Sequence, residues 1–130
     1  HELMHVIAFS SALFPLFPAG NPFIVVNDTQ YISSPKLKAE ISSHFNCSNP
    51  IGLPLEDQDG TLNSSHQERK VLGNEFMIAI NKKQAFVSRF TLALLDSTGW
   101  YDVNYTFAEP TGWGKNKGCN FLNLDICSSE

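Results

Sequence analysis

The sequence predicts a single α+β domain that is mainly helical and rich in loops. The chain has 130 residues, of which 42% are hydrophobic and 17% charged, and this is the composition of a folded domain rather than a disordered chain. Apolar residues recur at helical spacing in three separate stretches, whereas β-branched and aromatic residues gather in one short stretch. Segments rich in Asn, Pro, Gly and Ser lie between them.

Residues 1–14 are expected to form the first helix. His1, His5 and Ala12 belong to a set of positions separated by three or four residues, which places them on one side of a helix. Pro15 stops the helix. The apolar run of residues 6–19 begins inside this helix and is too short to span a bilayer. We interpret this run as a buried helix that leads into a loop.

Two stretches do not have helical spacing. Residues 23–32, "FIVVNDTQYI", are rich in strand-forming residues around the turn-prone pair Asn27-Asp28, and they form either a short pair of extended strands or a loop. Residues 46–65 are rich in Asn, Pro, Gly and Ser and predict a long irregular connection, which in compact domains is usually functional or disordered.

Two further helices have clear start and stop signals. In residues 34–45, Ser34 is a suitable N-cap, and Pro35 is suited to the first helical position. The later helix begins after Ser88 and ends at Gly99. The tail from residue 101 is expected to be rich in loops.

The pentapeptide "HELMH" at residues 1–5 has the spacing of a catalytic zinc motif. Histidines at positions i and i+4 of a helix project from one face, so His1 and His5 could bind one ion. Glu2 could take the proton of a water that attacks a polarised carbonyl and then transfer it to the leaving amine. Two histidines on a helix are more often surface or core residues, so the motif requires a third ligand.

His44, His66 and any acidic residue are candidates for that third ligand. His66 lies in a polar stretch and is followed by Met77, which favours a metzincin site with a third histidine and a methionine turn. His44 lies on the apolar side of its helix, where a structural role is the better interpretation.

The net charge and the N-glycosylation sequons indicate which binding partners and which cellular location to expect. The net charge is −4 and no basic patch is present, which excludes nucleic acid as an expected partner. Four N-x-S/T sequons begin at Asn27, Asn46, Asn63 and Asn104, and they favour a secreted or cell-surface protein. No lipidation or transmembrane signal lies in these residues, so any membrane association would depend on parts outside this chain.

The sequence resembles the leishmanolysin-type metalloproteases, also called major surface proteases. The matching stretches run in family order across nearly the whole chain: "HELMHVIAFS", "SPKLKAEISSHFNC", "GLPLEDQDG", "SHQERKVLGNEFM", "TLALLDSTGWYDVNY" and "WGKNKGCNFL". In that family a long insertion separates the zinc helix from the third histidine. The resemblance therefore implies a zinc helix at 1–14, an insertion at 15–65, the third ligand and methionine turn at 66–80, and a C-terminal helix and tail at 81–130.

The resemblance also implies the roles of single residues. His1, His5 and His66 would bind one Zn²⁺, Glu2 would be the general base and acid, and Met77 would support the imidazoles through packing. The function implied is a zinc-dependent endopeptidase that hydrolyses peptide bonds of protein substrates. Roughly residues 78–86 would line the pocket for the substrate residue after the scissile bond.

The resemblance also concerns the pairing of the cysteines and the residue at position 8, where this chain departs from the family pattern. It implies a disulfide between Cys47 and Cys119 and leaves Cys127 without a partner; the alternative is that all three are reduced. Metzincins have a glycine where this chain has Ala8. Either the helix continues past this position or Ala8 is strained, because a positive φ is costly for alanine.

Metzincins also have a twisted sheet before the zinc helix, and the resemblance implies that this upstream sheet is missing here. We therefore expect the isolated chain to bind zinc weakly and to be inactive, and the parent protein to be the competent enzyme. The alternative is a non-catalytic, leishmanolysin-like protein for cell-surface adhesion or binding. The presence of Glu2 argues against it, because a binding protein has no need of a general base.

Overall fold

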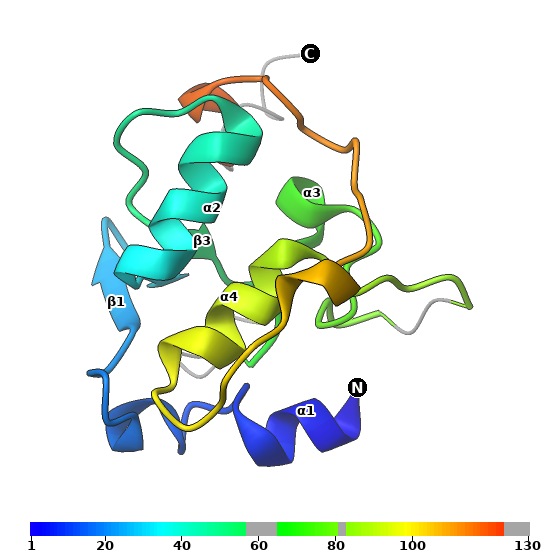
Figure 1. Cartoon of the computed structure of the whole chain (residues 1–130). Coiled ribbons are helices and arrows are strands. Elements are labelled where there is room, and N and C mark those ends of the chain that lie inside the picture. The colour runs from blue at the N-terminus through cyan, green and yellow to red at the C-terminus, as the bar shows by residue number, and fades with distance from the viewer. Residues whose placement is uncertain (57–64, 81–82, 124–130) are drawn as a thin grey trace.

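The computed structural model describes residues 1–56, 65–80 and 83–123, and in them it confirms the α+β class (Figure 1). Four α-helices accompany a three-stranded antiparallel sheet of order β1-β2-β3 in this part of the chain. The elements are α1 (Glu2–Ile7), the 3-10 helix η1 (Phe14–Leu16), β1 (Phe23–Val26), β2 (Thr29–Ile32), α2 (Pro35–Phe45), β3 (Leu53–Pro54), α3 (Arg69–Leu72), α4 (Arg89–Ser97), and the 3-10 helices η2 (Tyr105–Phe107) and η3 (Cys119–Leu122).

The first helix is shorter than expected: α1 ends at Ile7, so the prediction of a helix to residue 14 is wrong. The backbone N–H groups of Ala8 and Phe9 both donate to the carbonyl of Met4, at 3.0 and 2.9 Å, and this closes the helix end. Ala8 and Phe9 are fully buried, so the chain turns inward here. The φ of Ala8 is −159°, and the turn therefore needs neither glycine nor a positive φ.

The stretch 23–32 is a β-hairpin rather than a loop. Val26 pairs with Thr29, and the two residues between them, Asn27 and Asp28, have φ of 48° and 62°. Positive φ at both central residues is the requirement of a type I′ turn, whose twist matches that of the strands it joins. β3 adds to β2 through the pair Ile32 and Leu53. β3 lies within residues 46–65, where only an irregular connection was expected.

α2 and α4 pack against each other, and α2 also contacts β3 (Figure 1). The expected caps are present: the Ser34 hydroxyl accepts from the Leu37 N–H, and the Ser88 hydroxyl accepts from the Phe90 N–H, both at 3.1 Å. Gly99, just after α4, has φ of 80°. The shared core includes these buried residues: Phe14, Ile32, Leu37, Ile41, Phe45, Leu53, Phe90 and Leu94.

The short helix α3 was not expected from the sequence. The Glu68 carboxylate accepts from the Lys70 N–H at 3.0 Å and caps its first turn, and Gly73, with φ of 70°, ends it. A helix of four residues is too short to show a 3.6-residue period. It follows the strand-like segment of His66 directly.

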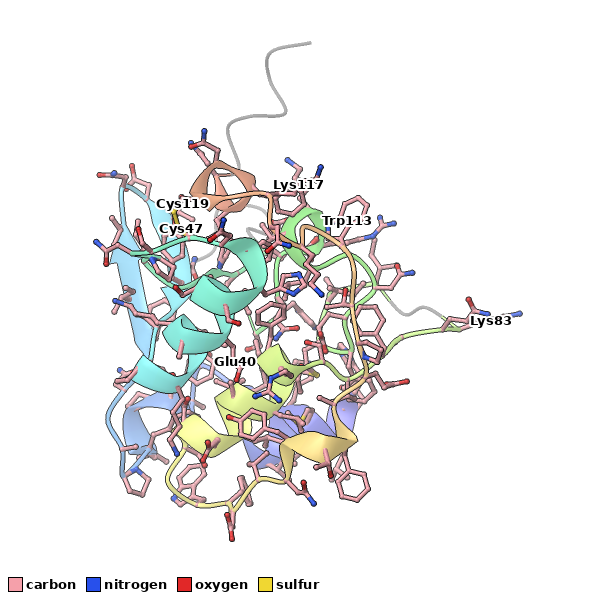
Figure 2. The ribbon with its side chains drawn as sticks, turned by 45° about the horizontal axis from the view of Figure 1, so that its top comes forward. Glu40, Cys47, Lys83, Trp113, Lys117 and Cys119 are labelled. Atoms are coloured by element: carbon pink, nitrogen blue, oxygen red, sulfur yellow. A yellow bond between two sulfur atoms is a disulfide. The ribbon has the colours of Figure 1, made fainter. Side chains whose placement is uncertain are left out.

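One disulfide joins the end of α2 to η3 in the described part of the chain (Figure 2). It links Cys47 to Cys119, the pair that the resemblance implies, with a Cα–Cα distance of 4.7 Å. Cys127 lies outside the described residues. Across those residues, no helix has the length and apolar character that crossing a membrane requires.

Gly114 is required by close packing, and we expect Gly114→Ala to destabilise the domain. Its φ is +71°, and a Cβ there would lie 2.5 Å from Cε1 of both Phe121 and Phe45. Overpacking of this kind costs about 1–3 kcal/mol, and the positive φ adds to it. Urea unfolding should show the loss. Gly112→Ala is the control, because a Cβ at Gly112 would meet nothing within 4 Å; equal effects of the two substitutions would contradict the packing argument.

Candidate metal centre

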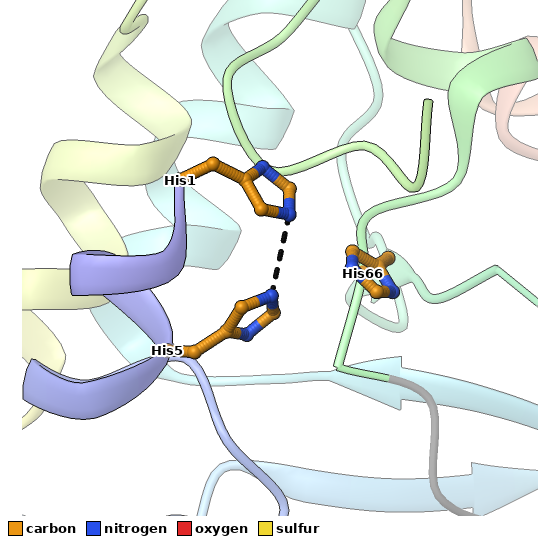
Figure 3. A group of neighbouring side chains, drawn as sticks. All are labelled: His1, His5 and His66. Atoms are coloured by element: carbon orange, nitrogen blue, oxygen red, sulfur yellow. Dashed lines mark hydrogen bonds between the residues drawn. The ribbon is translucent and has the colours of Figure 1, made fainter. Parts of the chain in front are cut away.

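Three histidine side chains from two distant parts of the chain converge beside α1 (Figure 3). His1 precedes the helix as its N-cap, His5 lies one turn later, and His66 enters from the segment before α3. One ring nitrogen of each lies within 4.8 Å of the others. The Nε2 atoms of His1 and His5 are 3.3 Å apart. Of the two histidines considered as third ligand, the structure therefore groups His66 with the helical pair.

Backbone carbonyls determine which nitrogens of the helical pair can face a cation. His1 Nδ1 lies 2.8 Å from the carbonyl oxygen of Phe76, and His5 Nδ1 lies 2.7 Å from that of Phe9. A carbonyl oxygen can only accept, so both Nδ1 atoms carry protons, and in the neutral rings both Nε2 atoms present lone pairs. Two lone pairs at 3.3 Å repel each other unless they share a cation, and the donor set therefore fits a metal ion.

His66 is half-buried, and its surroundings favour the neutral imidazole that a metal requires. Burial lowers the pKa of His66, and the charge of His5 lowers it further, whereas the Glu2 carboxylate raises it. The backbone holds the residue in place: its carbonyl accepts from the Glu56 N–H at 3.0 Å. Neutral imidazole nitrogens are the common zinc ligands in proteins.

Residues 74–78 contain Met77, the methionine expected in a methionine turn, and are called the Met-turn segment below. Their backbone is bonded to the ring of His1 and to the residue that follows His66. The Phe76 carbonyl accepts from the His1 ring, and the Met77 carbonyl accepts from the N–H of Gln67, the neighbour of His66, at 2.8 Å. The Met77 side chain is fully buried. The segment therefore connects His1 to the segment of His66.

Glu2 and His44 take different positions relative to the cluster. Glu2 is exposed on α1, next to His1 in sequence, and the charge of its carboxylate raises the pKa of the His66 imidazole. His44 instead donates from Nε2 to the Trp113 carbonyl at 2.7 Å and packs edge-on against Phe90, with ring centroids 5.2 Å apart. This agrees with the structural role expected for His44.

Sequence reasoning missed the carbonyls of Phe76 and Phe9 and the buried Glu75, which belongs to the Met-turn segment. A backbone carbonyl has no sequence signal, because every residue carries one. The burial of Glu75 has no sequence signal either, because glutamates are mostly exposed and the helix α3 before it was not expected from the sequence.

Comparisons with known proteins agree with the geometry. The leishmanolysin family model matches residues 1–129. The leishmanolysin-like peptidase of Drosophila melanogaster is 43% identical over 89 residues, which is 68% of this chain and 13% of the relative. The ciliated left-right organizer metallopeptidase of Danio rerio is 31% identical over 144 residues, which is 100% of this chain and 23% of the relative. The leishmanolysin homolog of Crithidia fasciculata is 32% identical over 131 residues, which is 94% of this chain and 19% of the relative.

The chain thus spans less than a quarter of the length of each of these relatives. The match nevertheless covers nearly all of this chain, including the zinc-motif helix, the His66 segment and the Met-turn segment. A family model that matches this much of a sequence shows common descent and a common domain type. The chain belongs to the leishmanolysin family of metallopeptidases, peptidase M8.

Proposed function

We propose that this sequence forms the metal-binding part of the active site of a zinc endopeptidase. The convergence of His1, His5 and His66 supports it most strongly, with the two helical Nδ1 atoms bonded to carbonyls. The family implies a metal and protein substrates. Three imidazoles match catalytic zinc sites, which keep a further position for water or substrate.

The residues of this chain would divide the chemistry of peptide hydrolysis between them. The three imidazoles would hold the ion, which when bound supplies Lewis acidity that polarises a carbonyl and lowers the pKa of a water. Glu2 takes a proton from the attacking water and returns it to the amine nitrogen as the peptide bond breaks. The carbonyls of Phe9 and Phe76 would keep the two helical imidazoles oriented, because each accepts a hydrogen bond from an Nδ1–H.

The metal site is tested most directly by His66→Ala in the full-length protein that carries this sequence. Wild-type protein should bind one zinc ion per chain, and losing one of three imidazoles should weaken the affinity at least about 100-fold. Chelator competition measures both quantities. His44→Ala is the matched control, because His44 is also half-buried but lies outside the cluster. Equal zinc affinity of the His66→Ala variant and the wild type would refute the site.

We also propose that the protein acts outside the cell or at its surface. The four sequons and the Cys47–Cys119 disulfide support this, because both N-glycans and stable disulfides belong to the secretory route. Mass spectrometry of protein from its natural source, before and after glycosidase treatment, tests the proposal. A chain with no glycan and with reduced cysteines would contradict it.

A further inference from the structure

Glu75 is a fully buried carboxylate in the Met-turn segment, and the chemistry proposed above does not use it. Burial raises the pKa of Glu75, and hydrogen bonds from Ser88 and Thr91 lower it again. Its Oε2 has no hydrogen-bond partner among the described residues. Burying a carboxyl group in this way costs stability, so its presence calls for an explanation other than stability alone.

The other oxygen of Glu75, Oε1, accepts hydrogen bonds from two separate parts of the chain. Oε1 accepts from the backbone N–H groups of Phe76 and Ser88, at 3.1 and 3.2 Å, and from the Thr91 hydroxyl at 2.8 Å. Ser88 is the N-cap of α4 and Thr91 lies in its first turn, and both are buried. Glu75 therefore attaches the Met-turn segment to the start of α4.

This attachment leads directly to a metal-binding side chain. The Phe76 N–H is held by Glu75 and also by the carbonyl of Phe86 at 2.9 Å. The carbonyl of the same residue, Phe76, accepts from His1 Nδ1 at 2.8 Å. The position of that carbonyl sets the orientation of the His1 ring, because the ring must direct Nδ1–H at it while Nε2 faces His5. A continuous chain of contacts thus runs from α4 through Glu75 and Phe76 to His1.

We infer that Glu75 is a positioning residue of the metal centre, which orients His1 through the Phe76 carbonyl. This inference rests on the proposed function, since it concerns the same site. A partner that orients a ligand in this way typically contributes about 10- to 100-fold to metal affinity. Glu75→Ala is therefore expected to weaken zinc binding by about that factor in protein that remains folded. Glu75→Gln keeps an acceptor oxygen in the same place and should restore most of the affinity.

The experiment compares wild type, Glu75→Ala and Glu75→Gln in the full-length protein. Zinc affinity is measured by chelator competition, and the visible absorption of the Co²⁺-substituted protein reports the ligand geometry independently of activity. Ser97→Ala is the matched control: Ser97 is also buried on α4, and its hydroxyl donates to the Ala93 carbonyl, at the opposite end of the helix from Glu75. It should lower stability without changing either the zinc affinity or the Co²⁺ spectrum.

The outcomes separate this inference from the proposed function. A wild-type protein that binds no zinc overturns both. If the wild type binds zinc and folded Glu75→Ala has the same zinc affinity and the same Co²⁺ spectrum, only the positioning role is overturned. Equal losses of affinity in Glu75→Ala and Glu75→Gln would also overturn that role alone. If Glu75→Ala does not fold, Thr91→Val decides, because it removes one donor and leaves the carboxylate in place. Weaker zinc binding by that variant supports the inference, and unchanged binding refutes it.

Discussion

Glu2→Gln is expected to reduce kcat/KM for peptide hydrolysis by about 10²- to 10⁴-fold, the range that a general base contributes. The glutamine has nearly the same shape but cannot take a proton from water. Zinc content should not change, because the imidazoles of His1, His5 and His66 are the candidate ligands and Glu2 is exposed beside them. The measurement is peptidase activity of the full-length protein, with zinc content determined on the same samples.

The control for this substitution is Asp102→Asn, which removes another exposed carboxylate far along the chain from α1. It should leave activity near the wild-type value, so that a general effect of net charge is separated from the role of Glu2. The same pair distinguishes the two functions that the sequence allows. A non-catalytic adhesion protein would have no peptidase activity to lose, and full activity in Glu2→Gln would exclude this residue as the base.

The elements that could be predicted from the sequence are those whose ends are determined locally. α2 and α4 were recognisable because Ser34 and Ser88 cap them and their apolar residues recur at helical spacing. The hairpin was half-predicted: Asn27-Asp28 indicated a turn, but whether the flanking residues pair depends on β3, which lies elsewhere in the chain.

The end of α1 could not be predicted because tertiary burial determines it. Residues 8–13 have adequate helix propensity, yet Ala8 and Phe9 are drawn fully into the core and the helix closes on the Met4 carbonyl. The family pattern was also misleading there, since it led to the expectation that the helix continues past Ala8 or that Ala8 is strained. The helix instead ends at Ile7, and Ala8 has a negative φ.

For the candidate site, the side chains could be proposed from the sequence, but their supports could not. "HELMH" has a spacing that a helix converts directly into a shared face. His66 was chosen over His44 through its relation to Met77 and the family resemblance, since nothing local indicates that residue 66 returns to residue 1. The carbonyls that hold the rings, and the Glu75 contacts behind one of them, depend on long-range backbone pairing.

Removing the disulfide is expected to have the largest effect on stability. Cys47 and Cys119 are separated by 72 residues in sequence, and closing a loop of that size restricts the unfolded chain by about 4 kcal/mol. The double substitution Cys47→Ala and Cys119→Ala should therefore lower the free energy of unfolding by several kcal/mol. Urea unfolding under oxidising conditions measures this change, and adding a reductant to the wild type should produce a similar loss.

Because of where the disulfide lies, we expect its loss to lower stability without changing the metal centre of the folded protein. The disulfide joins the end of α2 to η3 (Figure 2), whereas the candidate metal ligands lie at α1 and just before α3. We therefore expect the double variant to keep its zinc affinity at low temperature, where it is folded, and to lose it at a lower urea concentration than the wild type does. A reductant should have no further effect on the unfolding of the double variant. A loss of zinc affinity in the folded double variant would show that the bridge also shapes the site, because destabilisation alone changes only the fraction of folded molecules.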